Sequence, residues 1–337
     1  MRHIPHELAR QDRVITCWPA DAELWEDNLA PAQAEFAAFL SDLVAADDSG
    51  RRLPLTVFCA TGQAAESARA ALGEAADIRR EPYGDVWARD TGPVFAREGS
   101  GLVAVRFGFN GWGGKYQLAD DDTVAERAAS LAGATLDRRD LVIEGGALEF
   151  DGEGTVLTTR QCLLNPNRNP GLTEADAESR LKAALGVSKV LWLDEGLLFD
   201  HTDGHIDNVA RFAGPGVVVC QAPLGDDDPQ AEVLDACARQ LESMTDAKGR
   251  RLKVERIASP GLVAGEDGDP RPASHMNWVI GPKNLVVPTY GTPSAAQAVS
   301  DLQKIFPSRQ VIGRPSSSIL SGGGAFHCVT CHIPSGG

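Results

Sequence analysis

The feature that most constrains the fold of this chain is a unit that recurs several times along it. Each copy consists of an apolar strand, a glycine-containing turn, a second strand, a helix and a third strand. Complete copies occupy residues 92–145, 145–195, 207–258 and 276–314. Runs of β-branched and aromatic residues bounded by Gly or Asp predict the strands. Apolar residues spaced three to four positions apart, after Thr, Ser or Pro, predict the helices.

A fifth copy is divided between the two ends of the chain. Residues 13–19, 31–44 and 54–59 supply one hairpin strand, a helix and a closing strand. The strand that is missing there is available in residues 326–334. Pairing of the two ends would close five ββαβ units into a ring, as in propellers. The sequence therefore predicts a cyclic α/β architecture with five blades.

The five copies share a polar residue at a matching position. When the hairpins are aligned, the first strand of each opens with Asp90, Glu144, Asp207, Asn277 or Cys328. A single Asp or Asn at such a place is typical of an ordinary turn. Five such residues in register would converge near the axis of the ring. The alignment therefore predicts a site built from carboxylates, an amide and a thiol.

Two of the candidate residues have the chemistry of a nucleophile and a base. Cys328 follows the glycine-rich residues 321–324, which allow the backbone to approach a ligand closely. A free thiol has a pKa of about 8.5, so it needs a cationic neighbour or the substrate to become a nucleophile. His205 is the candidate base, because on an extended strand its side chain would share a face with that of Asp207.

The two aspartates indicate the charge of the substrate. Asp90 and Asp207 beside a thiol would oppose formation of the thiolate unless a cation lay among them. A guanidinium can form bidentate pairs with carboxylates. Each charge-assisted hydrogen bond contributes about 1.5–3 kcal/mol. These residues therefore suggest a hydrolase or transferase that acts on a guanidine carbon.

The segment "HCVTCH", residues 327–332, raises competing interpretations. Its C-x-x-C-H pattern is that of c-type haem attachment, and it could also describe a redox dithiol or part of a metal site. A structural zinc site needs more ligands than this cluster offers, since no second C-x-x-C is present. We expect one catalytic cysteine, Cys328, with Cys331 as a small buried side chain.

Cysteine content and charge indicate the cellular compartment of the protein and the kinds of partner that it can bind. Seven cysteines form no disulfide pattern and suit a reducing compartment. The first residues contain no apolar run of the kind found in export signals, so we expect a cytoplasmic protein without attached haem. A formal net charge of −15 disfavours nucleic acid and anionic membranes as partners.

Several long segments carry a family resemblance. The segments are "WARDTGPVF", "FNGWGGKY", "IEGGALEFDGEGTVLTT", "CLLNPNRNP", "GHIDNVARF" and "GGGAFHCVT". Together they resemble the agmatine deiminase and bacterial-type peptidylarginine deiminase family, and the likeness covers nearly the whole chain. It implies the pentein fold, a five-bladed α/β propeller with pseudo-fivefold ββαβ repeats around a central active site. It also implies that residues 1–337 form one catalytic domain.

The resemblance implies a role for each candidate residue. Cys328 would be the nucleophile, His205 the general acid and base, and Asp90 and Asp207 the carboxylates that bind the guanidinium. Further substrate-binding residues implied by the matching motifs are Trp87, Trp112, Glu144 and Asn277. No metal ion and no organic cofactor would be required.

The implied reaction converts agmatine to N-carbamoylputrescine and ammonia through a covalent thiouronium on Cys328, in putrescine (polyamine) biosynthesis. The oligomeric state that is usual in the family suggests a homodimer. Peptidylarginine deimination, another small guanidine, and amidino transfer to an amine remain alternatives, and so does a non-catalytic binding protein. The segment "TCHIP", residues 330–334, departs from the glutamine-rich run of the family. This departure leaves the reaction class intact and the substrate less certain.

Overall fold

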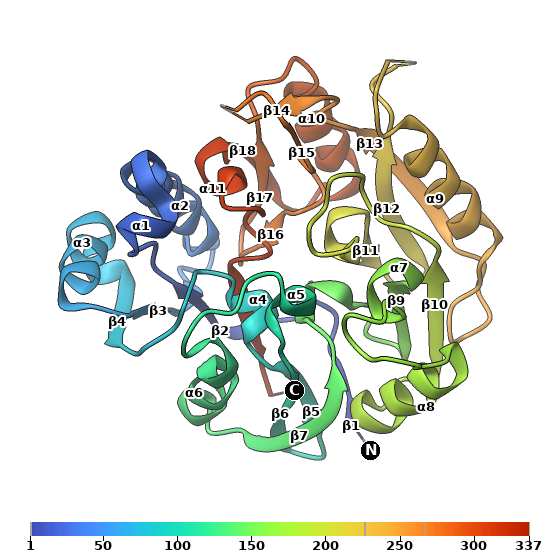
Figure 1. The fold of residues 1–337 in the computed structure, drawn as a ribbon, viewed down its shortest axis with the longest axis horizontal. Helices are drawn as coiled ribbons and strands as arrows, with labels where there is room; N and C mark the ends of the chain where they lie inside the picture. Colours follow the sequence, from blue (N-terminus) through green and yellow to red (C-terminus); the bar gives the residue numbers. More distant parts are fainter. Residues whose placement is uncertain (1, 226, 266, 337) are drawn as a thin grey trace.

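The structure is a computed structural model that describes residues 2–225, 227–265 and 267–336. Figure 1 shows α/β units arranged in a ring, with the short helices α4 (Ala88–Thr91) and α5 (Gly111–Gly114) near its centre. The described residues form five sheets that follow the ββαβ order, and one further small strand pair. The predicted repeat is therefore confirmed.

The first complete blade illustrates the unit. It contains β5 (Val94–Glu98), β6 (Gly101–Gly108), α6 (Val124–Ala132) and β7 (Thr135–Val142). β5 and β6 form an antiparallel hairpin, whereas β6 and β7 run parallel. Parallel neighbours need a crossover, and α6 supplies it. The short β1 (Arg2–His3) pairs with β5 at the edge of this sheet.

Three further blades repeat the same order and pairing. The next contains β8 (Glu149–Phe150), β9 (Thr155–Thr159), α8 (Glu174–Leu185) and β10 (Lys189–Leu193). It is followed by β11 (Ala210–Gly214), β12 (Val217–Ala222), α9 (Ala231–Ser243) and β13 (Lys253–Ala258). The fourth contains β16 (Val279–Ile280), β17 (Asn284–Thr289), α10 (Ala295–Ile305) and β18 (Gln310–Pro315). In each, an antiparallel hairpin precedes a parallel third strand.

The fifth blade joins the two ends of the chain, as predicted. It contains β2 (Gln11–Cys17), α2 (Leu29–Leu43), β3 (Leu55–Cys59) and β19 (Thr330–Pro334). β19 lies antiparallel to β2, with Thr330 opposite Thr16. A helix and strand that the sequence analysis did not assign, α3 (Gly62–Leu72) and β4 (Ala76–Arg80), extend this sheet.

Short elements connect the blades. The helical ones are α1 (Ala22–Trp25), α7 (Arg160–Leu163) and α11 (Ser317–Ser321), with 3₁₀ turns η1 (Glu26–Asn28), η2 (Gly73–Ala75), η3 (Asp121–Thr123), η4 (Gly145–Ala147) and η5 (Ile206–Asn208). A small antiparallel pair, β14 (Val263–Ala264) and β15 (Pro270–Arg271), lies outside the blades. Across the described ranges, no helix is both long enough and apolar enough to cross a bilayer.

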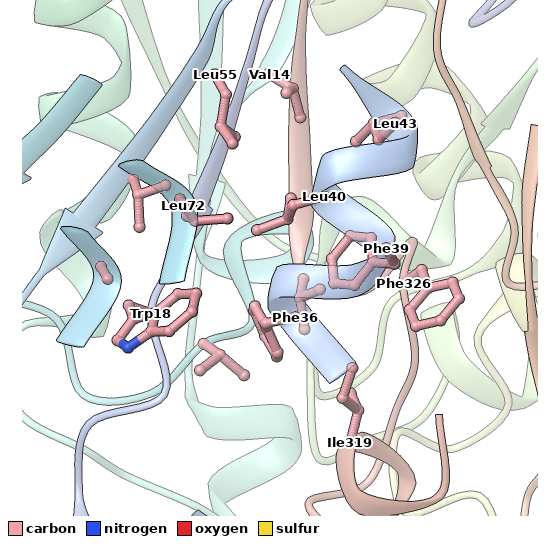
Figure 2. Close-up of a cluster of buried hydrophobic side chains, with 14 of the residues drawn as sticks. Val14, Trp18, Phe36, Phe39, Leu40, Leu43, Leu55, Leu72, Ile319 and Phe326 are labelled. Carbon is pink, nitrogen blue, oxygen red and sulfur yellow. The ribbon is translucent and has the colours of Figure 1, made fainter. Parts of the chain in front are cut away.

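An aromatic cluster anchors the segment that precedes Cys328. Phe39 of α2 packs against Phe36 of the same helix and against Phe326, and Figure 2 shows the three rings together. The Phe39 and Phe326 rings stack with centroids 4.4 Å apart, and both are fully buried. Burial of each ring contributes about 1.5–3 kcal/mol. Because Phe326 is two residues from Cys328, the core of the closing blade fixes the position of that thiol.

Candidate active site

A cavity of about 280 Å³ reaches towards the axis of the ring. Asp90 and Cys328 are the candidate reactive residues on its wall. Trp87 and Trp112, which were predicted to contact substrate, also line it. Its outer part holds aromatic and basic side chains, among them Phe199, His201, Arg271 and Tyr116. The cavity is therefore polar at its inner end and largely aromatic further out.

The five aligned residues lie around this inner end, although not on strands as expected. Asp90 and Cys328 line the cavity, whereas Asp207, Glu144 and Asn277 do not. Asp90 lies in α4 and Asp207 in η5, so each precedes the strand that it was predicted to open. Asn277 and Cys328 likewise come just before β16 and β19. The prediction that His205 and Asp207 share the face of an extended strand is wrong, because the chain forms a 3₁₀ turn there. The turn nevertheless directs both side chains to the same place.

The surroundings of Gly146 show how closely these side chains approach one another. A Cβ atom at this position would lie 2.7 Å from Asp90 Oδ1, 2.7 Å from His205 Nδ1 and 3.2 Å from Asp207 Oδ2. The backbone N–H of Gly146 also donates to Asp90 Oδ1 at 3.0 Å. Three chemical groups from two chain segments, α4 and the turn at η5, therefore surround a glycine of a third segment, which leaves no room for any side chain.

Local structure on the Asp90 side explains how this carboxylate is held. The indole of Trp112 donates to Asp90 Oδ2 at 2.9 Å. Trp112 has φ +51° within α5, a conformation that costs a non-glycine residue about 1–3 kcal/mol. Asn110 accepts from the backbone N–H of Gly113 and closes this turn. Such strain at a cavity wall is a recognised feature of binding sites.

The thiol of Cys328 lies between an amide and a carboxylate. Asn277 Nδ2 donates to the sulfur at 3.1 Å, and Asp207 Oδ2 lies 3.7 Å from it. Burial, together with the charges of Asp207 and Asp90, raises the pKa of this thiol well above its usual value. A cation between the two aspartates would reverse this effect, because it would stabilise the thiolate.

His205 is fully buried, between two carboxylates. Its Nε2 lies 3.4 Å from Glu144 Oε2, and its Nδ1 lies 3.7 Å from Asp90 Oδ1. Burial alone lowers the pKa of His205, but Asp90, Cys162 and Glu144 together raise it well above the usual value. Burial also raises the pKa of Asp90 to about 6, against the lowering effect of His205. The neighbouring groups therefore favour the protonated form of the histidine, which can act as an acid.

Asp207 is held from behind by His327. The ring Nδ1 of His327 lies 2.7 Å from Asp207 Oδ2. Burial raises the pKa of Asp207, but hydrogen bonding and charge from His327 lower it below its usual value. Among the described residues, Asp207 Oδ1 and His205 Nδ1 have no hydrogen-bond partner although they are buried. Such unsatisfied atoms are typical of groups that bind a ligand.

The structure differs from the sequence analysis for two of the predicted substrate-binding residues. Glu144 and Asn277 do not line the cavity. Glu144 lies behind His205 and pairs with Arg168 Nε at 2.7 Å, with both side chains fully buried. Asn277 lies behind Cys328 and accepts from the backbone N–H of His327 at 2.8 Å. Their positions favour a role in orienting reactive residues over direct contact with substrate.

Sequence reasoning missed Arg168 and the contacts of His327. Arg168 lies in the motif "CLLNPNRNP", which was noted only as part of the resemblance. His327, which the sequence analysis treated only as part of the segment 327–332, contacts Asp207. The available signal was a buried histidine next to the candidate nucleophile, which spacing alone could not interpret.

The surroundings of Cys331 and His332 decide between the interpretations of the C-x-x-C-H pattern. Cys331 lies in the hydrophobic core beside Pro93, and burial raises its pKa to about 11. His332 is buried and its Nδ1 lies 3.1 Å from Arg89 Nη2. Neither residue lines the cavity that Cys328 faces. Cys328 and Cys331 therefore have separate surroundings, as predicted.

One group of side chains has the geometry of metal ligands. Glu144, Cys162 and His205 offer ligand atoms within 4.8 Å of one another. The guanidinium of Arg168 is bound directly to Glu144, and its positive charge opposes a divalent cation there. These residues therefore fit an ion-paired cluster better than a metal site.

Comparison with known proteins identifies the class and then the family. A ring of five ββαβ units with polar residues at its axis is the pentein fold, which a DDAH of Pseudomonas aeruginosa shares (TM-score 0.56, 12% identity, covering 96% of this chain and 99% of that chain). The chain belongs to the Porphyromonas-type peptidyl-arginine deiminase family, whose pattern matches residues 3–334.

Two relatives are similar to this chain over nearly its whole length. An agmatine deiminase of Ectopseudomonas mendocina is 36% identical over 358 residues, which cover 98% of this chain and 95% of the relative. The solved structure of an agmatine deiminase of Enterococcus faecalis has a TM-score of 0.93 and 32% identity, and covers 99% of this chain and 96% of that chain.

Proposed function

We propose that this protein is a deiminase that hydrolyses the guanidinium of agmatine, with residues 1–337 acting as one catalytic domain. The observation that carries the proposal is that Cys328 and Asp90, which line the cavity, lie beside His205 and Asp207, which do not line it. Two carboxylates hold the thiol protonated until a cation arrives. A planar guanidinium fits that requirement, because it can pair with both carboxylates and place its carbon beside the sulfur.

The reaction follows from the charges of these groups. Entry of the guanidinium lowers the pKa of the Cys328 thiol, which releases its proton to water. The thiolate attacks the guanidine carbon and forms a C–S bond. Protonated His205 donates to a nitrogen of the adduct, the C–N bond breaks, and ammonia leaves. A thiouronium then remains attached to Cys328.

Hydrolysis of this intermediate restores the enzyme. His205, now neutral, accepts a proton from a water molecule that adds to the same carbon. The C–S bond breaks as the hydroxyl of this adduct gives its proton to the departing sulfur, so the Cys328 thiol is restored and a ureido product leaves. With agmatine the product is N-carbamoylputrescine, and its formation would supply putrescine biosynthesis.

The names of the relatives support agmatine as the substrate, since two full-length relatives are agmatine deiminases. The aromatic wall formed by Trp87 and Trp112 can cover an apolar butyl chain. Arg271 on the outer wall favours a second candidate, a guanidine with a carboxylate at its far end, such as arginine or an arginyl peptide. Arg271 Nη2 pairs with Asp267 at 2.5 Å, so the Asp267 carboxylate would compete with a substrate carboxylate for this guanidinium.

Ammonia release by the purified protein tests the proposal. Agmatine, free arginine and a blocked arginyl peptide are compared at matched concentrations. Strong preference for agmatine supports the proposed substrate, whereas activity on the other two alone supports the second candidate. The absence of turnover with all three would contradict a deiminase and favour a guanidine-binding protein on the same fold.

We also propose that the protein is cytoplasmic and forms a homodimer. The location is supported by seven free cysteines, which suit a reducing compartment. The oligomeric state is an expectation from the family, and sedimentation equilibrium at several concentrations would measure it.

A further inference from the structure

Asp85 is a buried carboxylate on the wall of the cavity, apart from the reactive residues at its inner end. The indole of Trp25 donates to Asp85 Oδ1 at 2.9 Å, and the indole of Trp87 donates to Asp85 Oδ2 at 2.7 Å. Each oxygen thus has a neutral donor, and the carboxylate can accept further hydrogen bonds at its remaining lone pairs. The deimination steps above do not involve this carboxylate.

The described residues supply no cation that pairs with Asp85. The only side chains among them that bond to it are the two indoles, and Asp21 nearby adds a second negative charge. Arg271 also lines the cavity, but it is already paired with Asp267. Buried charges in proteins are normally paired. An unpaired carboxylate in a cavity wall is therefore suited to a cationic group of a ligand.

Trp87 connects Asp85 with the thiol of Cys328. A Cβ atom placed on Gly324 would lie 2.6 Å from Trp87 Cζ3 and 3.2 Å from Cys328 Sγ. Cζ3 belongs to the six-membered ring and lies across the indole from Nε1. The thiol is therefore near one side of the indole, whereas Asp85 is hydrogen-bonded to the other side. The two groups are separated by the width of an indole ring and one hydrogen bond.

This separation suits a short aliphatic chain with a nitrogen at each end. Four methylene groups between two nitrogens extend to roughly 6 Å, given bond lengths of about 1.5 Å. A guanidinium held beside Cys328 and Asp90 would therefore place a nitrogen four carbons away near Asp85. Trp87 and Trp112 would cover the carbons between the two ends.

We propose that Asp85 binds the distal ammonium of the substrate and thereby selects guanidines that end in a cation. The proposal rests on the deiminase function proposed above and names the residue that sets its substrate class. Agmatine has this ammonium, whereas an arginyl residue within a peptide does not. Free arginine has it as well, but the adjacent carboxylate would lie beside Asp85, where like charges repel. Asp85 therefore favours agmatine over both.

The kinetic test uses n-butylguanidine, which has the guanidinium and the four carbons of agmatine but no ammonium. The unmodified protein should have a kcat/KM for agmatine about 10- to 100-fold higher than for n-butylguanidine, because the ammonium adds a charge-assisted hydrogen bond. Asp85→Asn should lose most of this ratio, mainly through a higher KM for agmatine. An equal loss for both substrates would contradict the proposal, because a structural defect does not distinguish them.

Asp246→Asn is the matched control. Asp246 is a buried carboxylate that pairs with Arg250 and does not line the cavity. This variant should keep the ratio of the unmodified protein, whatever its effect on stability. A ratio that fell as far in the control as in Asp85→Asn would contradict the assignment, because loss of any buried carboxylate would then have the same effect.

A binding test needs no turnover and does not depend on the folding of Asp85→Asn. Agmatine and n-butylguanidine are titrated into Cys328→Ala by calorimetry, and agmatine should bind at least about tenfold more tightly. Equal affinities, with ammonia release from agmatine by the unmodified protein, would overturn this inference and leave the proposed function standing. Tighter binding of agmatine without ammonia release from any guanidine would support this inference and contradict the proposed function.

Discussion

Asn277 contacts Cys328 through both ends of its side-chain amide. Its Nδ2 donates to the sulfur at 3.1 Å, and its Oδ1 accepts from the backbone N–H of Cys328 at 3.2 Å. The amide thus fixes the rotamer of the thiol and offers a hydrogen bond to the thiolate when it forms. A residue predicted to touch substrate therefore contacts the candidate nucleophile in the structure.

We expect Asn277→Ala to reduce kcat by about 10- to 100-fold while KM for agmatine changes little. A hydrogen bond to a charged group contributes about 1.5–3 kcal/mol, and this one gains strength as the thiolate forms. Steady-state kinetics on agmatine measure the effect. Asn284→Ala is the control, since among the described residues the Asn284 side chain bonds only to the backbone of Asp42. A change confined to KM would place Asn277 in substrate binding after all.

Gly146→Ala should lower kcat/KM by about 100-fold, since displacing reactive groups by about 1 Å has effects of that size. The added methyl carbon would lie 2.7 Å from both Asp90 Oδ1 and His205 Nδ1, so both side chains must move. The control is Gly101→Ala at the start of β6, where the nearest atom would be 3.4 Å away. If Gly146→Ala retained full activity, the convergence of the three groups would have no catalytic meaning.

Arg168→Gln should lower the free energy of unfolding by about 3–5 kcal/mol, the usual effect of removing one partner of a buried ion pair. The variant leaves the Glu144 carboxylate buried without its guanidinium. Urea denaturation measures the loss. Arg160→Gln is the comparison, because its pair with Glu174 is partly exposed and should contribute at most about 1 kcal/mol. Equal losses would argue against the buried pair as a structural element.

The kcat/KM for agmatine should rise with pH through an apparent pKa near 6. Burial raises the pKa of Asp90 to about 6, so the carboxylate is neutral below that pH and charged above it. Only the charged form pairs with a guanidinium. Because Asp207 has a lowered pKa, it is already ionised in this range. A pH profile from 4.5 to 8 tests this, and activity that fell as pH rose through 6 would contradict it.

The overall architecture could be predicted because it is encoded locally. Each ββαβ unit has its own alternation and helical spacing, and the divided fifth unit revealed the pairing of β2 with β19. The strand register around the site could not be predicted, because the aligned residues lie in turns such as η5 that strand periodicity does not describe. The extension of the closing blade by β4 was likewise missed.

The sequence predicted which residues belong to the candidate site better than it predicted the contacts among them. Asp90 and Cys328 were placed correctly at the cavity, since their position within each repeat is fixed. Partnerships such as those of Glu144 with Arg168 and of His327 with Glu7 join residues far apart in sequence. They depend on how turns from different blades fit together, and the pattern within one unit contains no information about that.

The most direct test of the account is the intact mass of the protein after acid quenching during turnover of agmatine. We predict a covalent adduct with the mass of agmatine less ammonia, mapped by peptide analysis to Cys328. Cys331→Ser should still form it, and Cys328→Ala should form none and release no ammonia. An adduct on another residue, or ammonia release by Cys328→Ala, would contradict the assignment of Cys328 as the nucleophile.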